Sequence, residues 1–281
     1  MLGSAAFQYL SNRFPGSVYA TARSPAVKRI FPRDAANITV GIDVENADAL
    51  TGFLRDVRPD VVLNCVGVVK QLASAEDPLV AIPINSIMPH RLARLADLVG
   101  ARLVHISTDC VFTGRKGDYR ESDVPDAEDL YGRSKLLGEV DYPNAVTLRT
   151  SIIGREIGSR NGLVEWFLSQ SGAVRGYRRA IFSGLTTDEL VRVIVERVLP
   201  NPDLRGVYHV SVDPISKFDL LGIVRNTYGV ATEIEPDDAV AIDRSLNSDR
   251  FRAATGYAPP SWPDLIRSMR RFDEESFSQV R

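Results

Sequence analysis

The chain has 281 residues, of which 44% are hydrophobic and 25% are charged, and its formal net charge is −2. Its length allows a sizeable core, its composition is that of an ordinary globular protein, and its charge gives no reason to expect nucleic acid or an anionic membrane as partner. No apolar run approaches the roughly 20 residues that span a bilayer. Cys65 and Cys110 lie in or beside predicted buried strands, which indicates reduced thiols and predicts a cytoplasmic protein.

Predicted strands and helices alternate along the first 150 residues. Apolar and amphipathic segments predict a first helix from Met1, then strands at 18–22, 38–40, 60–65, 102–106 and 145–150, and helices at 47–57 and 85–98. The alternation loosens afterwards, with helices at 187–199, 218–228 and 265–269 and a strand at 207–210. This pattern predicts an α/β fold with a Rossmann-type doubly wound parallel sheet. We expect a nucleotide-binding domain at 1–150, to which the chain returns at about 181–211, and a smaller, mostly substrate-binding α+β domain at 151–281.

The stretch 107–135, which begins STDCVFTG and ends YGRSK, carries the most chemistry. Thr108 follows a predicted buried strand, at the edge where open parallel sheets bind their ligands. Tyr131 and Lys135 are four residues apart, so they share one face of a helix. An ammonium favours the ionised form of a nearby phenol, so we expect Lys135 to lower the pKa of Tyr131. A surface helix with a solvated lysine would show the same spacing, but the preceding strand end favours the active site of a reductase.

The segments STDCVFTG, YGRSK and LRTSIIG resemble the extended short-chain dehydrogenases/reductases, and within them the dTDP-4-dehydrorhamnose reductase branch. The resemblance covers nearly the whole chain and is most specific over 64–154. It implies that Thr108, Tyr131 and Lys135 are catalytic, and that Lys135 also holds the nicotinamide ribose. It further implies an oxidoreductase that reduces a nucleotide-linked 4-keto-6-deoxy sugar with NADPH, for polysaccharide synthesis.

The residues expected to bind the cofactor lie near strand ends and at the first helix. Arg23 follows the strand at 18–22 and favours NADP(H), because a basic residue suits the ribose 2′-phosphate; a solvated loop arginine is the alternative, and NAD stays open. The resemblance places Asp43 beside the adenine, and Gly67 would let the backbone approach the dinucleotide closely. The full expected set is Leu2, Gly3, Arg23, Asp43, Val44, Val66, Gly67, Tyr131 and Lys135.

The chain begins without the hydrophobic strand and glycine-rich turn that open a dinucleotide-binding fold. The resembled turn reads G-x-x-G-x-x-G, and only its last glycine is present, as Gly3. The missing strand would lie in the middle of the sheet, so its absence leaves backbone groups unpaired and part of the core uncovered. We therefore expect Met1 to be an internal methionine of a protein that is about ten residues longer.

Asp109 is expected to contact the substrate. In the related 4,6-dehydratases an Asp-Glu pair follows the threonine, whereas here Cys110 follows Asp109. One carboxylate cannot easily serve as both acid and base, so dehydration is disfavoured. A nucleotide-sugar epimerase remains open, as does a non-catalytic subunit resembling the regulatory subunit of methionine adenosyltransferase. The expected partner is a nucleotide sugar, with no nucleic acid and no membrane, and a homodimer is left open.

Other polar residues are weaker candidates. Asn85 matches a family asparagine at the start of a helix, or it is a helix N-cap. The histidines are too scattered for a metal site and are expected to be structural; they are His90, His105 and His209. Four further residues could reach a nucleotide diphosphate, but each type is more often a surface or ion-pair residue, so they stay outside the expected site; they are Arg149, Tyr177, Arg178 and Arg244.

Overall fold

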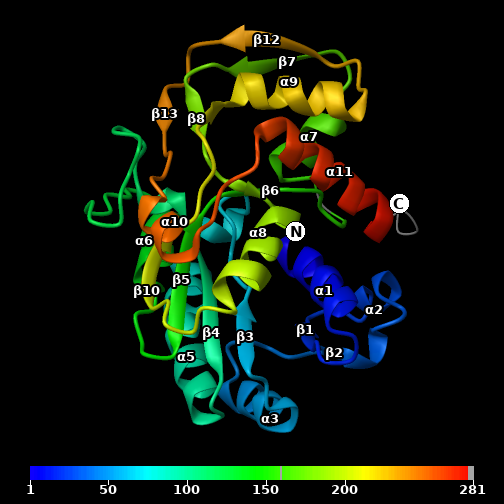
Figure 1. Ribbon diagram of the computed structural model, residues 1–281, viewed down its shortest axis with the longest axis vertical. Helices are drawn as coiled ribbons and strands as arrows, with labels where there is room; N and C mark the ends of the chain where they lie inside the picture. The colour runs from blue at the N-terminus through cyan, green and yellow to red at the C-terminus, as the bar shows by residue number, and fades with distance from the viewer. Residues whose placement is uncertain (159, 278–281) are drawn as a thin grey trace.

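The computed structural model describes residues 1–158 and 160–277 and confirms the predicted α/β class with parallel sheets (Figure 1). The helices are α1 (Leu2–Arg13), α2 (Val27–Ile30), α3 (Ala47–Val57), α4 (Pro78–Ala81), α5 (Met88–Leu98), α6 (Leu130–Leu137), α7 (Leu163–Leu168), α8 (Thr187–Val193), α9 (Lys217–Tyr228), α10 (Asp249–Thr255) and α11 (Trp262–Phe277). The strands are β1 (Ala20–Ala22), β2 (Ile38–Val40), β3 (Val61–Asn64), β4 (Arg102–Thr108), β5 (Ala145–Thr150), β6 (Ile152–Ile153), β7 (Ala173–Tyr177), β8 (Ala180–Phe182), β9 (Leu185–Thr186), β10 (Gly206–His209), β11 (Ile215–Ser216), β12 (Glu233–Asp237) and β13 (Ile242–Asp243). No helix in the described ranges is long and apolar enough to cross a membrane.

The largest sheet has the order β10-β5-β4-β3, and all its strands are parallel. Helices cover both of its faces, so β4 is apolar on each side. Leu103 belongs to a buried cluster with Met88 of α5, whereas its neighbour Val104 belongs to the cluster that contains Leu190 of α8. Successive side chains of a strand point to opposite faces, which explains why the two neighbours enter different cores.

A second parallel pair, β1 and β2, stands apart from this sheet, beyond its β3 edge (Figure 1). In doubly wound folds with the strand order 3-2-1-4-5-6, one strand lies between the pair that corresponds to β1 and β2 and the strand that corresponds to β3. No described residue forms a strand there, so β3 is an edge strand. Its side chains Val61, Val62 and Leu63 are accordingly only partly buried.

The first helix, α1, still reaches the carboxyl end of β3. Leu2 and Ala6 belong to the main core, and Phe7 packs edge-on against Phe31 in the small core under β1 and β2. A Cβ atom added at Gly3 would lie 3.5 Å from Cβ of Cys65, the residue that follows β3. The N-terminus of α1 is therefore held against the exit of β3.

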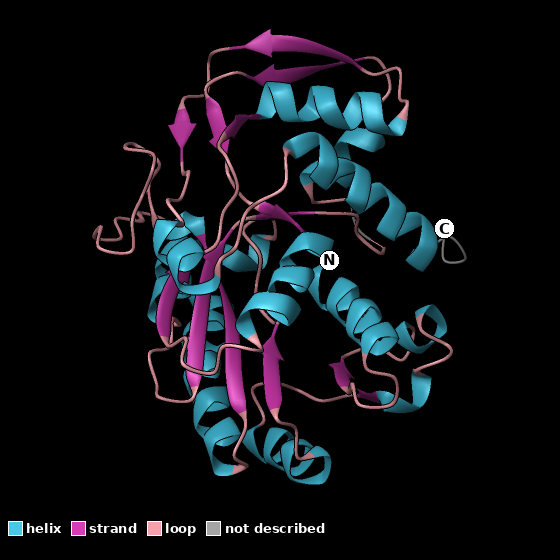
Figure 2. Cartoon of the chain, viewed as in Figure 1, coloured by secondary structure: helices cyan, strands magenta, loops and turns pink. Residues whose placement is uncertain are grey.

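A smaller layer of strands and helices lies at the carboxyl end of the main sheet, toward which β3 points (Figure 2). It contains the sheet β11-β8-β13 and the pair β12-β7, with α9 packed against them. The layer is tied to the loop after β4. Within this loop, Tyr119 N donates to Ser245 O at 2.9 Å, and Tyr119 O accepts from Asn247 N at 2.7 Å. Gly114 O, in the same loop, accepts from Asp243 N at 2.8 Å.

The predicted elements agree with the structure most closely where the pattern is strongest. The segments 38–40, 47–57 and 145–150 coincide with β2, α3 and β5. The helix predicted to begin at Asn85 instead begins at α4 and passes through a π-helical turn, Ile82–Ile87, before α5. The strands β7, β8, β12 and β13 were not predicted. The strands β8 and β13 have only three and two residues, and β7 and β12 contain Gly176 and Pro236, which are unfavourable in strands.

Candidate active site

Close packing at the start of α6 brings Tyr131 to the carboxyl end of β4. Asp129 caps this helix by accepting a hydrogen bond from Gly132 N at 2.7 Å. A Cβ atom at Gly132 would lie 2.3 Å from the carbonyl oxygen of Cys110, so only glycine fits this approach. The first turn of α6 therefore rests on the residues that follow Thr108.

Tyr131 lies beside Thr108 and among acidic side chains. Burial raises the pKa of Tyr131 above its usual value, Asp109 and Asp129 act in the same direction, and a hydrogen bond with Thr108 opposes them. The prediction that Lys135 lowers the pKa of Tyr131 is therefore wrong for this structure. Burial disfavours the charged phenolate and is the largest cause of this upward shift.

Lys135 is buried, with its side chain between the exits of β3 and β4. Its Nζ atom donates to the carbonyl oxygen of Ile106 at 2.8 Å, and a Cβ atom at Gly67 would lie 4.0 Å from that nitrogen. Burial lowers the pKa of Lys135 to about 8, against the opposing effect of Glu139. Tyr131 and Lys135 thus lie on one helix as predicted, but their roles stay predictions.

Asn85 ties the loop after β3 to α6. Its Oδ1 accepts from Val68 N at 2.9 Å, and its Nδ2 donates to Val68 O at 3.1 Å and to Ser134 Oγ at 3.2 Å. The side chain is almost fully buried and lies inside the π-helical turn, so the N-cap interpretation is wrong. Asn85 instead positions the backbone that contains Gly67.

Thr108 and Asp109 form a small hydrogen-bonded unit at the end of β4. The Thr108 hydroxyl accepts from Cys110 N at 3.1 Å and donates to Asp109 Oδ1 at 3.1 Å. Burial raises the pKa of Asp109, while Arg244 and Lys217 act against that shift. The structure therefore brings Thr108, Asp109 and Tyr131 together at one place.

A buried ion pair that the sequence did not reveal holds the far end of α6. Glu139 accepts from Arg149 Nε at 2.7 Å and from Arg149 Nη2 at 2.6 Å, and both side chains are 6% exposed. Ser107 Oγ donates to the same carboxylate at 2.7 Å. Arg149 is thus occupied by Glu139 and is not available to a nucleotide. No sequence signal indicated this pair, because Glu139 follows the end of α6 and Arg149 lies in β5.

The expected cofactor residues near α1 and β3 fit a dinucleotide. Leu2 is buried in the core, so it offers only its backbone, whereas Gly3 is exposed in the first turn of α1, which has no side-chain cap. Val66 and Gly67 are exposed beside Lys135. Free backbone N–H groups at a helix start and two glycines without Cβ atoms allow close approach of a phosphate and a ribose.

The remaining expected cofactor residues follow β1 and β2. Arg23 and Asp43 are exposed, and Asp43 accepts a hydrogen bond from Glu45 N at 2.9 Å. Val44 is partly buried against the core cluster shared by α3 and α5, which makes it a packing residue in this structure. Only two of these three side chains are therefore free to contact a ligand.

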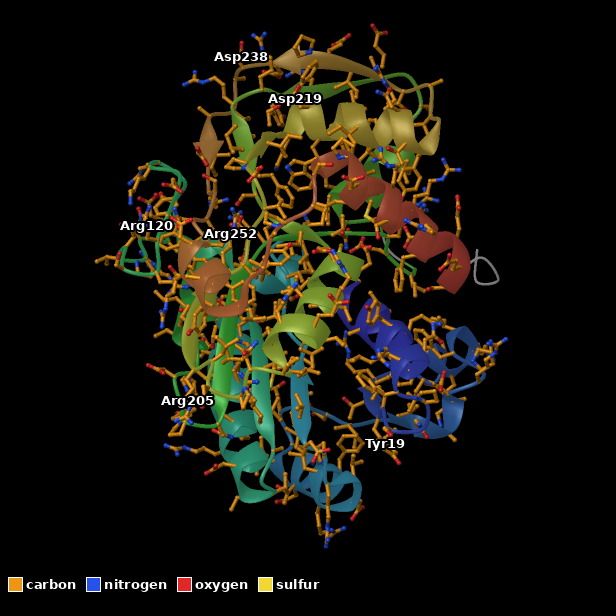
Figure 3. All side chains as sticks on the ribbon, viewed as in Figure 1. Tyr19, Arg120, Arg205, Asp219, Asp238 and Arg252 are labelled. Carbon is orange, nitrogen blue, oxygen red and sulfur yellow. The ribbon has the colours of Figure 1, made fainter. Side chains whose placement is uncertain are left out.

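Two of the weaker candidates, Arg149 and Arg178, are occupied by carboxylates. Arg178, next to Tyr177 at the end of β7, forms an ion pair with Asp238, which lies beside β12 at the upper end of the molecule (Figure 3). The described residues contain no group of three or more His, Cys, Asp or Glu side chains that could hold a metal ion. Arg244 alone lies beside the candidate site, where its Nε donates to Phe112 O at 2.7 Å.

The three histidines have local partners. His105 Nδ1 is 3.0 Å from Asn64 Nδ2, and His90 Nδ1 is 3.0 Å from the Tyr142 hydroxyl. His209 contacts the buried ion pair, with Nε2 3.3 Å from Arg149 Nη1. These contacts agree with the structural role expected for all three.

Comparisons with known proteins give both curated relatives and solved structures. Over 197 residues the chain is 29% identical to methionine adenosyltransferase 2 subunit beta from Danio rerio, which covers 65% of this chain and 60% of that protein. Over 101 residues it is 38% identical to dTDP-4-dehydrorhamnose reductase from Mycobacterium tuberculosis (strain ATCC 25618 / H37Rv), a third of each chain. The chain spans 52% to 60% of the length of the methionine adenosyltransferase 2 subunit beta proteins from Danio rerio, Xenopus tropicalis and Xenopus laevis.

Solved structures agree with the fold. A dTDP-4-dehydrorhamnose reductase from Bacillus anthracis in complex with NADP has a TM-score of 0.73 at 22% identity, over 90% of this chain and 98% of that one. A dTDP-glucose 4,6-dehydratase double mutant from Streptomyces venezuelae with NAD bound has a TM-score of 0.74 at 19% identity, over 99% and 96%. Residues 17–262 match the family described as RmlD substrate binding domain. The chain therefore belongs to the RmlD substrate binding domain family.

Proposed function

We propose that the protein is an NADPH-dependent reductase of a nucleotide-linked 4-keto-6-deoxy sugar. The observation that carries this proposal is the placement of Tyr131 beside Thr108, one helical turn from the buried Lys135, at the carboxyl edge of a parallel sheet. The Mycobacterium tuberculosis and Bacillus anthracis relatives support it, because both are dTDP-4-dehydrorhamnose reductases and the latter is bound to NADP.

The proposed chemistry converts a ketone into an alcohol. When bound, the reduced nicotinamide supplies a hydride to the carbonyl carbon. Tyr131 donates its proton to the carbonyl oxygen, and its raised pKa keeps that proton in place until the substrate needs it. By this proposal the Lys135 ammonium stabilises the phenolate once the proton has left, whereas in the structure burial keeps the pKa of Tyr131 raised.

Thr108 would stabilise the negative charge that develops on the carbonyl oxygen. In the structure its hydroxyl hydrogen is directed to Asp109, and its oxygen already accepts from Cys110 N. A hydroxyl has only one hydrogen to donate, so the Thr108 hydroxyl must turn from Asp109 toward the substrate for this role. Asp109 accepts a hydrogen bond from Thr108 in the structure, and we propose that it also contacts the substrate.

The residues that would hold the cofactor line one edge of the fold. Gly67 and Lys135 would lie along the nicotinamide ribose, and the first turn of α1 would face the pyrophosphate. Arg23 favours the 2′-phosphate of NADP, and NAD is the alternative. Of the expected set, Leu2 would offer only its backbone and Val44 packs against the core, which leaves Gly3, Arg23, Asp43, Val66, Gly67, Tyr131 and Lys135 to contact the cofactor.

A second candidate is a non-catalytic subunit. Several curated relatives are methionine adenosyltransferase 2 subunit beta proteins, at 23% to 29% identity. The presence of Thr108, Tyr131 and Lys135 favours the enzyme over this candidate. An epimerase would need the same residues and cofactor, but it would consume no NADPH.

The test is a panel of nucleotide-linked 4-keto sugars, followed by NADPH absorbance and product analysis. We expect NADPH consumption with formation of the 4-hydroxy sugar, and its loss in Tyr131→Phe. Redox-neutral conversion of the substrate would instead identify an epimerase. Co-purification with a larger enzyme, without NADPH oxidation on any sugar, would identify the non-catalytic subunit.

A further inference from the structure

The loop that follows β3 is attached to the helix of the candidate active site by an ion pair. Val68 and Ala75 of this loop are buried, whereas residues 69–73 between them are exposed. Lys70 Nζ donates to Asp129 Oδ2 at 2.6 Å. Within the described ranges, this is the only hydrogen bond or ion pair that joins residues 69–73 to a part of the chain outside the loop. Lys70 therefore determines where the exposed part of the loop is attached.

The partner of Lys70 is the residue that caps α6. Asp129 uses one carboxylate oxygen for Gly132 N, at 2.7 Å, and the other for Lys70. Burial acts to raise the pKa of Asp129, but the hydrogen bonds from Gly132 N and Lys70 lower it below its usual value. The carboxylate is therefore charged at neutral pH, and it connects the loop directly to the helical turn that contains Tyr131.

A second attachment joins the same loop to the next turn of α6. Asn85, which is bonded to Val68, donates to Ser134 Oγ at 3.2 Å. Tyr131 lies along the helix between this attachment and the one at Asp129. The second attachment is buried, whereas the side chains of the Lys70–Asp129 pair are 43% and 41% exposed. The turn with the proposed proton donor thus depends on the more exposed of the two attachments.

An exposed ion pair of this kind affects position more than folding. Water and salt weaken such a pair, so its contribution to stability is small. A reacting group that is displaced by about 1 Å can nevertheless cost about 10²-fold in rate. Close packing of Gly132 on Cys110 O fixes α6 relative to the residues after β4, but not relative to the loop after β3. The ion pair supplies that second restraint on the first turn of α6.

We propose that Lys70 is a positioning residue, which through Asp129 holds the first turn of α6, and with it Tyr131, against the loop after β3. This proposal deepens, and rests on, the reductase function proposed above. Lys70 takes no part in the chemistry, since its ammonium is bonded to the carboxylate that caps the helix. Gly67, in the same loop, is expected to lie along the cofactor. The pair would therefore keep the proton donor and the nicotinamide in a fixed relation.

The first test measures kcat at saturating NADPH and keto sugar. Lys70→Met removes the ammonium, and Asp129→Asn removes the charge but keeps a side chain that caps helices equally well. We expect each variant to lower kcat about 3- to 30-fold, and the double variant to be no slower than either, because both remove one interaction. Lys70→Arg should recover most of the rate. Arg115→Met is the matched control, since its exposed partner Glu128 precedes Asp129, and its kcat should be unchanged.

The two substitutions also separate position from electrostatics. Lys70→Met removes a positive charge and Asp129→Asn a negative one, and the charge of Asp129 acts to raise the pKa of Tyr131. An effect through the electric field would therefore shift the pH profile of kcat in opposite directions in the two variants. Opposite shifts, or losses that add in the double variant, would overturn the proposal. A raised KM for the sugar with unchanged kcat in Lys70→Met would make Lys70 a substrate contact and overturn it as well.

Amide hydrogen exchange of the intact protein gives a readout that does not depend on turnover. Exchange in residues 66–75 should be about three- to tenfold faster in Lys70→Met and in Asp129→Asn, and unchanged in Arg115→Met. Salt at 1 M should accelerate exchange in the wild type toward that of the variants, because the pair is exposed. Unchanged exchange in both variants would overturn the proposal. Faster exchange without reduction of any keto sugar by the wild type would refute the reductase and leave the attachment standing.

Discussion

The two ends of the proposed cofactor site are built differently. At the end near α6, the Lys135 amine is buried, Asn85 fixes the loop that contains Gly67, and the Glu139–Arg149 ion pair holds the helix. At the other end, Arg23 and Asp43 are exposed on the short pair β1 and β2. Buried, fully bonded groups keep their geometry, whereas exposed charges are mobile and screened by salt. Substitutions at the first end should therefore change turnover and folding, and those at the second only cofactor affinity.

The largest effect is expected at Tyr131. Tyr131→Phe removes the proton donor but keeps the ring that packs at the start of α6, so turnover should fall about 10²- to 10⁴-fold. NADPH affinity should be nearly unchanged, as fluorescence titration can show. Substantial residual turnover in this variant would remove Tyr131 from the role of acid.

The next largest effect is expected for the buried ion pair between Glu139 and Arg149 at the end of α6. Glu139→Gln leaves Arg149 buried without its counter-charge, and we expect a loss of about 3–5 kcal/mol in the free energy of unfolding. The matched control is Glu128→Gln, whose partner Arg115 is exposed and whose loss should not be measurable. Urea unfolding compares the two variants, and equal midpoints would show that the buried pair does not stabilise the fold.

A smaller effect concerns pH and Lys135. The pKa of Lys135 is about 8 in the folded protein, against its usual value of 10.5, which applies to the unfolded chain. Between these two pH values the folded protein therefore binds fewer protons than the unfolded chain. Stability contributed through Lys135 should therefore rise with pH across this window. Below it, burying the charged amine costs on the order of 3 kcal/mol.

Unfolding free energies of the wild type and Lys135→Met, measured from pH 7 to 10, test this expectation. The free energy of unfolding of the wild type should increase relative to that of the variant as pH rises through about 8. A constant difference between the two proteins would mean that Lys135 is already neutral, or that it is not desolvated in the folded state. Activity should not be used as the readout, since Lys135 belongs to the proposed catalytic set.

The sequence predicted most of the sheet and the helix with Tyr131 and Lys135, because these depend on local periodicity. It could not rank Arg149 against Arg244, since their difference lies in which carboxylate is close in space. Glu139 neutralises Arg149 across the end of α6, whereas Arg244 reaches the site only because β13 pairs with β8. Likewise, the pKa of Tyr131 depends on burial, which the spacing to Lys135 does not report.

The smallest effect tests the exposed end of the cofactor site. Arg23→Asp reverses a charge that no described carboxylate pairs with, so folding and turnover at saturating cofactor should be unchanged. If Arg23 contacts the 2′-phosphate, NADPH affinity should fall about three- to tenfold, with less effect at high salt, and NADH affinity should not fall. Arg29→Asp, an equally exposed change on α2, is the control for net charge. Equal losses for NADPH and NADH would mean that Arg23 acts only through the general field, and that the preference for NADP must arise from residues elsewhere along this edge.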